Sequence, residues 1–148
     1  MKLIEASLAH CEVLAELHAQ GFDAPWTVKA FTSALSSPGV FTLIAVKGED
    51  EPLGFVLVRV GGGEAEIQTL VTGKAARRSG VAKALMDAVL FKIRSAEVDK
   101  IFLEVATDNL AAQNLYRGLG FAKVGRRKAY YDRGTGGRVD ALVMSLAV

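Results

Sequence analysis

The sequence predicts one mixed α/β domain, and three observations point to this fold class. The 148 residues suffice for a single hydrophobic core, and their composition, 51% hydrophobic and 23% charged, is that of an ordinary soluble protein. Segments with strand-like and helix-like hydrophobic periodicity follow one another along the whole chain. No linker, repeat or low-complexity tract interrupts them, so residues 1–148 are expected to form a single domain.

The first quarter of the chain predicts a short strand and two helices. The strand is LIE, near residue 4, and Ser7 can then cap a helix that runs to His18. The apolar residues of this helix recur at helical spacing: Leu8, Cys11, Leu14 and Leu17. The segment PWTVKAFTSAL, residues 25–35, predicts a second and shorter helix.

The middle of the chain predicts three antiparallel strands and a long helix. VFTLIAV and LGFVLVRV have the composition of strands, and the polar turn KGEDEP between them predicts a hairpin. The glycine run at 61–63 turns the chain into a third strand, EAEIQTLVT. Residues 81–94 are strongly amphipathic at helical period and predict a helix.

The last third predicts a strand, a helix and two closing strands. IFLEV, residues 101–105, is apolar and β-branched enough for a buried strand, and Asn109 to Leu119 predict a helix that Gly120 can end. FAKVGRR and DALVMSLAV predict the closing strands. The order is therefore a strand, two helices, three antiparallel strands, a helix, a strand, a helix and two strands.

The composition argues against a membrane-spanning, secreted or metal-binding protein. No apolar run is long enough to cross a membrane, and MKLIEASLAH lacks the apolar stretch of a signal peptide. Cys11 is the only cysteine, so an internal disulfide is excluded and a reducing, cytoplasmic location is expected. The two histidines, His10 and His18, lack further ligands at metal-binding spacing, so no metal site is expected.

One basic segment is suited to binding an anion. The net charge is −5 over residues 1–70 and +7 over residues 71–148, and a basic half can meet nucleic acid, an acidic membrane or a polyphosphate ligand. The segment RRSGVAKALM leads into the predicted helix at Gly80, where free backbone N–H groups and the helix dipole favour an anion. It matches neither the dinucleotide fingerprint nor the P-loop. The alternative is a helix start with solvated arginines.

The spacing R-x-x-G-x-A at residues 77–82 resembles the Q/R-x-x-G-x-G/A pyrophosphate loop of the GNAT N-acetyltransferases. The predicted element order is similar to that family's order over the whole chain. PWTVKAF, LEVATDNLAAQNLYRGLGF and RRKAYYDRGTGGRVDALVMSLAV also resemble its ribosomal-protein-alanine subfamily. Thr72-Gly73-Lys74 departs from the pattern, because relatives usually have a valine and, two residues later, a proline. A less rigid loop is therefore expected here.

The resemblance implies a fold and a donor. The fold is a mixed, largely antiparallel sheet of six to seven strands, splayed in its middle, with about four helices. The donor is acetyl-CoA, with no metal; its pyrophosphate would bind the loop amides, and its pantetheine arm would pair with the strand edge like an added strand. The implied donor-binding residues are Leu70, Val71, Thr72, Arg77, Arg78, Ser79, Gly80, Val81, Ala82, Lys83 and Asn109.

Glu104 and Tyr116 are the catalytic candidates by the same resemblance. Glu104 would be the general base, with Glu66 as the second candidate; the alternative for Glu104 is a structural carboxylate paired with an arginine. Tyr116 would donate a hydrogen bond or a proton to the leaving thiolate, although full transfer from a phenol to a thiol is uphill by about 2 kcal/mol in water. Its alternative is core packing. Asn109 can cap its helix, contact CoA, or do both.

The acceptor is expected to be a protein N-terminus. At pH 7 roughly a tenth of an α-amine is neutral, against well under a thousandth of a lysine amine, so a general base deprotonates the α-amine more easily. Trp26, Tyr130 and Tyr131 can line the acceptor groove, or else pack in the core. The leading hypothesis is acetylation of an alanine-starting ribosomal protein.

Two alternative functions stay open. One is acetylation of a small amine, such as a polyamine. The other is a ribosome- or RNA-binding module without catalysis, although the basic residues are not interleaved with stacking aromatics as single-strand binders require. Direct nucleic-acid binding and membrane binding are therefore not expected.

Overall fold

The computed structural model describes residues 1–49 and 51–148 and confirms the predicted fold class. Within these residues, the strands form one sheet in the order β1-β2-β3-β4-β5-β7-β6. The strands are β1 (Lys2–Glu5), β2 (Val40–Lys47), β3 (Glu51–Gly61), β4 (Glu64–Thr72), β5 (Lys100–Ala106), β6 (Ala122–Asp132) and β7 (Arg138–Ala147). The helices are α1 (Cys11–Gly21), α2 (Val28–Leu35), α3 (Val81–Arg94) and α4 (Leu110–Gly118), with short 3-10 turns η1 (Leu8–His10), η2 (Lys74–Ala76) and η3 (Gly134–Gly136).

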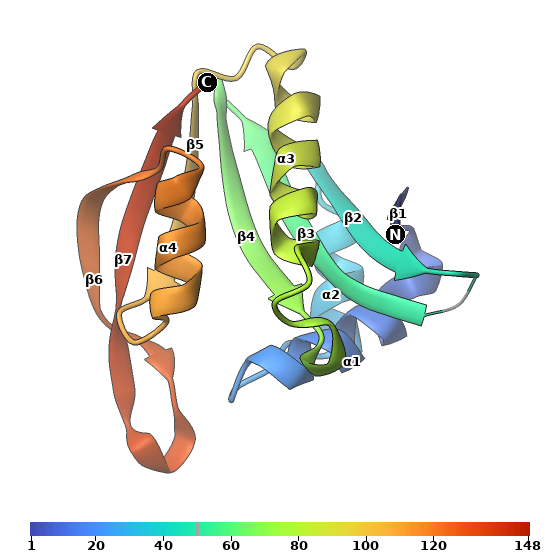
Figure 1. Cartoon of the computed structure of the whole chain (residues 1–148), viewed down its shortest axis with the longest axis horizontal. Helices are drawn as coiled ribbons and strands as arrows, with labels where there is room; N and C mark the ends of the chain where they lie inside the picture. Colours follow the sequence, from blue (N-terminus) through green and yellow to red (C-terminus); the bar gives the residue numbers. More distant parts are fainter. Residues whose placement is uncertain (50) are drawn as a thin grey trace.

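Helices cover both faces of the sheet. Figure 1 shows α3 and α4 in front of the strands and α1 and α2 behind them. The core under α1 and α2 is built from apolar side chains: Leu14, Leu17, Phe31, Ile44, Phe55, Leu57 and Val71. The core under α3 and α4 includes Val56, Ile67, Leu85, Met86, Val89, Ile101, Leu103 and Met144. The apolar face of each helix thus packs against a face of the sheet.

The sheet is splayed in its middle. β4 and β5 are parallel and pair only from Glu64 with Lys100 to Ile67 with Leu103, and beyond that point the two strands diverge (Figure 1). A register shift against β3 leaves Gln68 as a bulge where the strands part. Bulges bend a strand, and this one turns the later side chains of β4 to the opposite face. The edge of β4 on the side of β5 therefore has no strand partner after Ile67.

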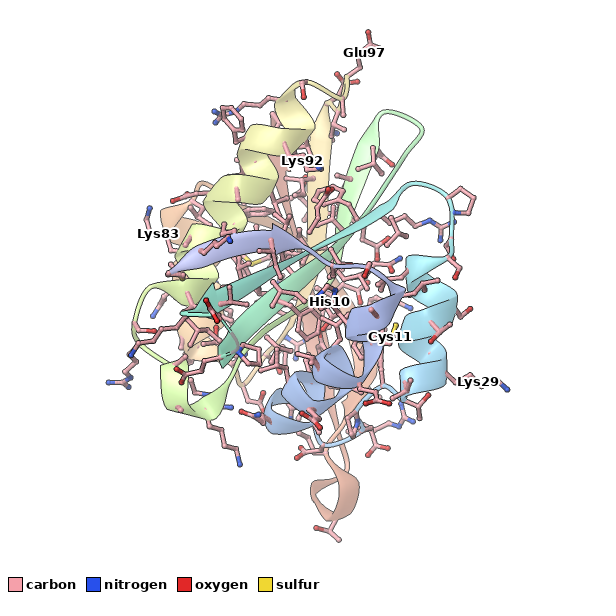
Figure 2. All side chains as sticks on the ribbon, turned by 90° about the vertical axis from the view of Figure 1, so that its right-hand side faces the viewer. His10, Cys11, Lys29, Lys83, Lys92 and Glu97 are labelled. Atoms are coloured by element: carbon pink, nitrogen blue, oxygen red, sulfur yellow. The ribbon has the colours of Figure 1, made fainter. Side chains whose placement is uncertain are left out.

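The first helix differs from the prediction. Residues 8–10 form a 3-10 turn because Ser7 N–H donates to the His10 Nδ1 atom at 2.9 Å, and the α-helix begins only at Cys11. Leu8 is consequently 56% exposed instead of lying in the core. Cys11 is buried, as expected of a small core residue, and lies at the start of α1 beside α2 (Figure 2).

Two other boundaries also differ. The second helix starts at Val28 instead of Pro25, because Thr27 caps it by accepting a hydrogen bond from Ala30 N–H at 3.1 Å. β6 continues to Asp132, five residues beyond the predicted strand. The hairpin of β2 and β3 forms as predicted, and Asp50, part of the predicted turn KGEDEP, lies outside the described residues. No helix in the described part of the chain has both the length and the apolar character needed to span a bilayer.

Candidate active site

The first turn of α3 forms a cradle for an anion. Ala84 N–H makes the first hydrogen bond of the helix, to Gly80 O at 3.0 Å, so the amides of residues 81–83 have no partner within the helix. Arg78 and Gly80 have left-handed backbones, with φ of 62° and 83°. Such turns aim successive N–H groups to one side and form anion-binding concavities. Apart from its two chain neighbours, no described residue has a heavy atom within 4 Å of a Cβ built on Gly80, so a phosphate group can approach this backbone.

The cations predicted around this cradle are not all free. The Arg77 guanidinium donates to Gln20 O at 2.9 Å, and Lys83 Nζ pairs with Asp87 at 2.8 Å. Figure 2 shows Lys83 pointing away from the body of the molecule. The Ser79 hydroxyl donates to the Ala76 carbonyl and does not line the groove. The loop amides, instead of these side chains, are therefore the main donors that the cradle offers to an anion.

The loop before α3 is tied to α1 and β3. Gly73 N–H donates to Leu53 O at 2.7 Å, and Lys74 N–H donates to Gln20 Oε1 at 2.8 Å. Gln20 thus receives two hydrogen bonds from this loop, one on its side chain and one, from Arg77, on its backbone. These contacts hold the segment that departs from the family pattern.

A groove of about 980 Å³ passes from the cradle through the splay of the sheet. Its floor is the parted ends of β4 and β5. On one side lie the first turns of α3 and α4, and on the other lie the α1–α2 segment and the hairpin of β6 and β7. Apart from Ser79, every predicted site residue lines it: Trp26, Leu70, Val71, Thr72, Arg77, Arg78, Gly80, Val81, Ala82, Lys83, Glu104, Asn109, Tyr116, Tyr130 and Tyr131.

Glu104 lies on the floor of this groove with one oxygen paired and one free. Its Oε1 atom accepts a hydrogen bond from Arg127 Nη1 at 2.7 Å, and the guanidinium lies over the Tyr130 ring at 4.3 Å. The Oε2 atom is buried and has no hydrogen-bond partner among the described residues. The arginine pairing that the sequence offers as the alternative role of Glu104 is therefore present, and the Oε2 atom stays available as an acceptor for water or an amine. Glu66 is exposed and lines the same groove.

Tyr116 is buried on α4 and packs edge-on against Phe121, with ring centroids 5.8 Å apart. Burial, with a smaller contribution from Tyr131, raises the pKa of the Tyr116 phenol, so the phenol holds its proton and offers a hydrogen-bond donor. Asn109 caps α4, as predicted, since its Oδ1 atom accepts a hydrogen bond from Ala112 N–H at 3.1 Å.

Aromatic rings form the far side of the groove. The Tyr131 hydroxyl donates to Glu104 O at 3.0 Å, and Tyr130 packs edge-on against Tyr131 and is 41% exposed. Phe22, which sequence reasoning missed, lies 6.4 Å from Tyr131 between ring centroids. His18 lies on the buried face of α1, and its spacing of seven residues from Cys11 and four from Leu14 is the sequence signal for that burial.

Comparison with known proteins identifies this arrangement. The model of the acetyltransferase (GNAT) family matches residues 11–121. N-alpha-acetyltransferase RimI of Mycobacterium tuberculosis is 36% identical over 129 residues, which cover 83% of this chain and 79% of that protein.

Solved structures of acetyltransferases have the same fold as this chain. The ribosomal-protein-S18-alanine N-acetyltransferase of Escherichia coli superposes with a TM-score of 0.88 at 25% identity, covering 99% of this chain and 93% of that one. The Arabidopsis thaliana NAA60 in complex with acetyl-CoA has the same fold, with a TM-score of 0.85 at 20% identity over 99% of both chains. The chain described here therefore belongs to the GNAT family of acetyltransferases.

Proposed function

We propose that this enzyme transfers an acetyl group from acetyl-CoA to the N-terminal α-amine of a protein, with an alanine-starting ribosomal protein as the acceptor. One observation carries the proposal: the anion cradle and Glu104, whose buried Oε2 atom has no hydrogen-bond partner among the described residues, line one groove, which runs through the splayed sheet to an aromatic wall. The names of the relatives, RimI and ribosomal-protein-S18-alanine N-acetyltransferase, favour this acceptor.

The donor side of the groove fits acetyl-CoA. The free amides of residues 81–83 and the open space beside Gly80 suit a pyrophosphate. The unpaired edge of β4 from Gln68 to Thr72 offers backbone groups to the amides of a pantetheine arm. Acetyl-CoA supplies the acetyl group as a thioester, and the remaining chemistry belongs to side chains of this chain.

Glu104 acts as the general base. The acceptor amine arrives largely as an ammonium ion at neutral pH, and the buried Oε2 atom of Glu104 accepts its proton, directly or through one water molecule. The neutral nitrogen then attacks the acetyl carbonyl carbon, and the second proton that the nitrogen loses as the amide forms passes to solvent. Arg127 holds the other carboxylate oxygen, so the free oxygen keeps one orientation.

Tyr116 stabilises the leaving sulfur by donating a hydrogen bond. In water, full proton transfer from a phenol to a thiolate costs roughly 2 kcal/mol. Burial raises the pKa of the Tyr116 phenol, so this transfer costs more free energy in the groove than in water. The carbon–sulfur bond thus breaks with the Tyr116 hydroxyl as a hydrogen-bond donor, and the thiolate takes its proton from solvent.

The charge pattern disfavours the RNA-binding alternative. Around the hairpin of β6 and β7, three arginines are already paired with carboxylates: Arg126 with Asp140, Arg127 with Glu104 and Arg133 with Asp108. In each pair a carboxylate already occupies the guanidinium, so these three arginines are not free to bind an RNA backbone.

Three acceptors test the proposal. Initial rates with acetyl-CoA are compared for a peptide that starts with alanine, the same peptide blocked at its N-terminus, and spermidine. We expect turnover of the free peptide alone, because only it offers an α-amine of low pKa. Equal or faster turnover of spermidine would establish the small-amine alternative instead.

A further inference from the structure

The segment between α1 and α2, residues 22–27, forms one wall of the groove but has few bonds of its own. It contains neither helix nor strand. Among the described residues, one hydrogen bond holds its middle, residues 23–26: Trp26 N–H donates to the His18 Nδ1 atom at 3.0 Å. The position of this wall therefore depends on a side chain of the preceding helix.

His18 is built into that position by aromatic packing. It is 2% exposed and lies at the centre of a ring cluster. Its neighbours, by ring-centroid distance, are Phe22 stacked at 4.2 Å, Trp26 at 5.4 Å, Phe31 edge-on at 5.6 Å and Phe55 at 6.4 Å. Because Nδ1 accepts a hydrogen bond, the ring is neutral with its proton on Nε2. Burial lowers its pKa to about 4, which keeps it neutral at physiological pH.

The cluster connects the two sides of the groove. Phe22, stacked on His18, faces Tyr131 of β6 at 6.4 Å. The Tyr131 hydroxyl in turn donates to the backbone carbonyl of Glu104 at 3.0 Å. His18, which lines the groove itself, thus supports rings that lead across it to the backbone of the proposed base.

We propose that His18 is a positioning residue for the acceptor: its ring and its Nδ1 atom hold Phe22 and Trp26 at the place where the acceptor N-terminus enters. This inference rests on the proposed function. The donor cradle is held by other groups of α1, the side chain and carbonyl of Gln20, so we expect a change at His18 to act on the acceptor more than on acetyl-CoA.

Two substitutions separate the ring from the hydrogen bond. His18→Phe keeps an aromatic ring and leaves Trp26 N–H without its acceptor, whereas His18→Asn keeps an acceptor oxygen near Nδ1 and removes the ring. His10→Asn is the matched control, because His10 lies outside the groove lining and serves only the first turn.

Steady-state kinetics give the first readout. His18→Phe should raise KM for the alanine-starting peptide by about tenfold, since an unsatisfied N–H destabilises the bound form of the wall. KM for acetyl-CoA should stay nearly unchanged. His18→Asn should raise the peptide KM less than His18→Phe, and His10→Asn should not raise it. A parallel rise in both KM values would mean general disruption and would overturn the inference.

Trp26, the single tryptophan of the chain, gives a second readout without any acceptor. Acrylamide should quench its fluorescence more strongly in His18→Phe than in the wild type or in His10→Asn. If the wild type acetylates no peptide, the proposed function fails, but this measurement still decides the inference. Unchanged quenching in a His18→Phe protein that binds acetyl-CoA normally would refute it.

Discussion

His18 should make the stability of this enzyme sensitive to mild acid. Burial lowers the pKa of the imidazole from its ordinary 6.5 to about 4. Between these two pH values, His18 is therefore protonated in the unfolded chain and neutral in the folded chain. The contribution of neutral His18 is complete above pH 6.5 and is lost as the pH falls toward 4. At about 1.4 kcal/mol per pH unit, the full loss is about 3 kcal/mol, of which about 2 kcal/mol falls between pH 7 and pH 5.

The physical reason lies in the surroundings of the ring. Every aromatic neighbour of His18 is uncharged, and burial is the one cause of the shift, so no carboxylate compensates an imidazolium there. Protonation would also place an N–H donor at Nδ1, facing the Trp26 N–H that now donates to it. Two donors in contact are repulsive, which adds to the cost of desolvating the charge.

Urea unfolding of the wild type and of His18→Phe at pH 7, 6 and 5, followed by circular dichroism, measures this effect. The hydrogen bonds to Asp108 and Asp140 lower the pKa of each carboxyl, which also costs stability in acid, but both proteins share these groups and the difference cancels them. The wild type should lose about 2 kcal/mol more than His18→Phe between pH 7 and pH 5. Parallel losses in the two proteins would show that His18 is not buried as a neutral ring.

Three further predictions concern the site. Gly80→Val should abolish acetyl-CoA binding in calorimetry, because the side chain fills the open space beside the cradle. Gly62→Val, at a turn glycine with φ of 62° and similarly open surroundings, should not. Equal acetyl-CoA affinities of the two variants would contradict an anion site at α3. Glu104→Gln should lower kcat most at low pH, where the amine arrives protonated, with partial rescue at high pH. If Glu66→Gln alone shows this behaviour, the base lies on β4. Tyr116→Phe should keep acetyl-CoA affinity and lower kcat by about 10²–10⁴, and an unchanged kcat would leave Tyr116 with core packing only. Because burial raises the pKa of this phenol, the wild type should lose no activity through ionisation of Tyr116 below about pH 10.

The sequence predicts best those elements whose pattern is local and sharply bounded. Residues 64–72 and 81–94 have the same bounds in the prediction and the structure, because Gly63 and Gly73 bound a strong strand period and Gly80 precedes a strong helical period. The end of β6 is different. Residues 128–132 are polar and largely exposed, and they are strand because Tyr131 and Asp132 pair with β7, a contact that no local pattern reveals.

The same division holds for the site. The cradle can be predicted because its parts lie within a few residues of one another, around Gly80. Which arginine pairs with Glu104 cannot be predicted, since Arg127 is 23 residues away in the sequence and lies across the intervening strand β7. His18 has the spacing of a buried residue, but its hydrogen bond to Trp26 depends on how the following segment folds back over α1.

β6 forms one outer edge of the sheet, and its sequence bears on how the protein behaves at high concentration. An exposed edge strand invites pairing with a strand of another molecule, which is a common start of aggregation. This edge carries the exposed cations Lys123, Arg126 and Lys128 and two breaks in its register, and Ala129 twists it further with φ of 50°. The opposite edge, β1, has only four residues. Both edges therefore resist strand addition, and exchanging the β6 cations for apolar residues would endanger colloidal stability more than it would the fold.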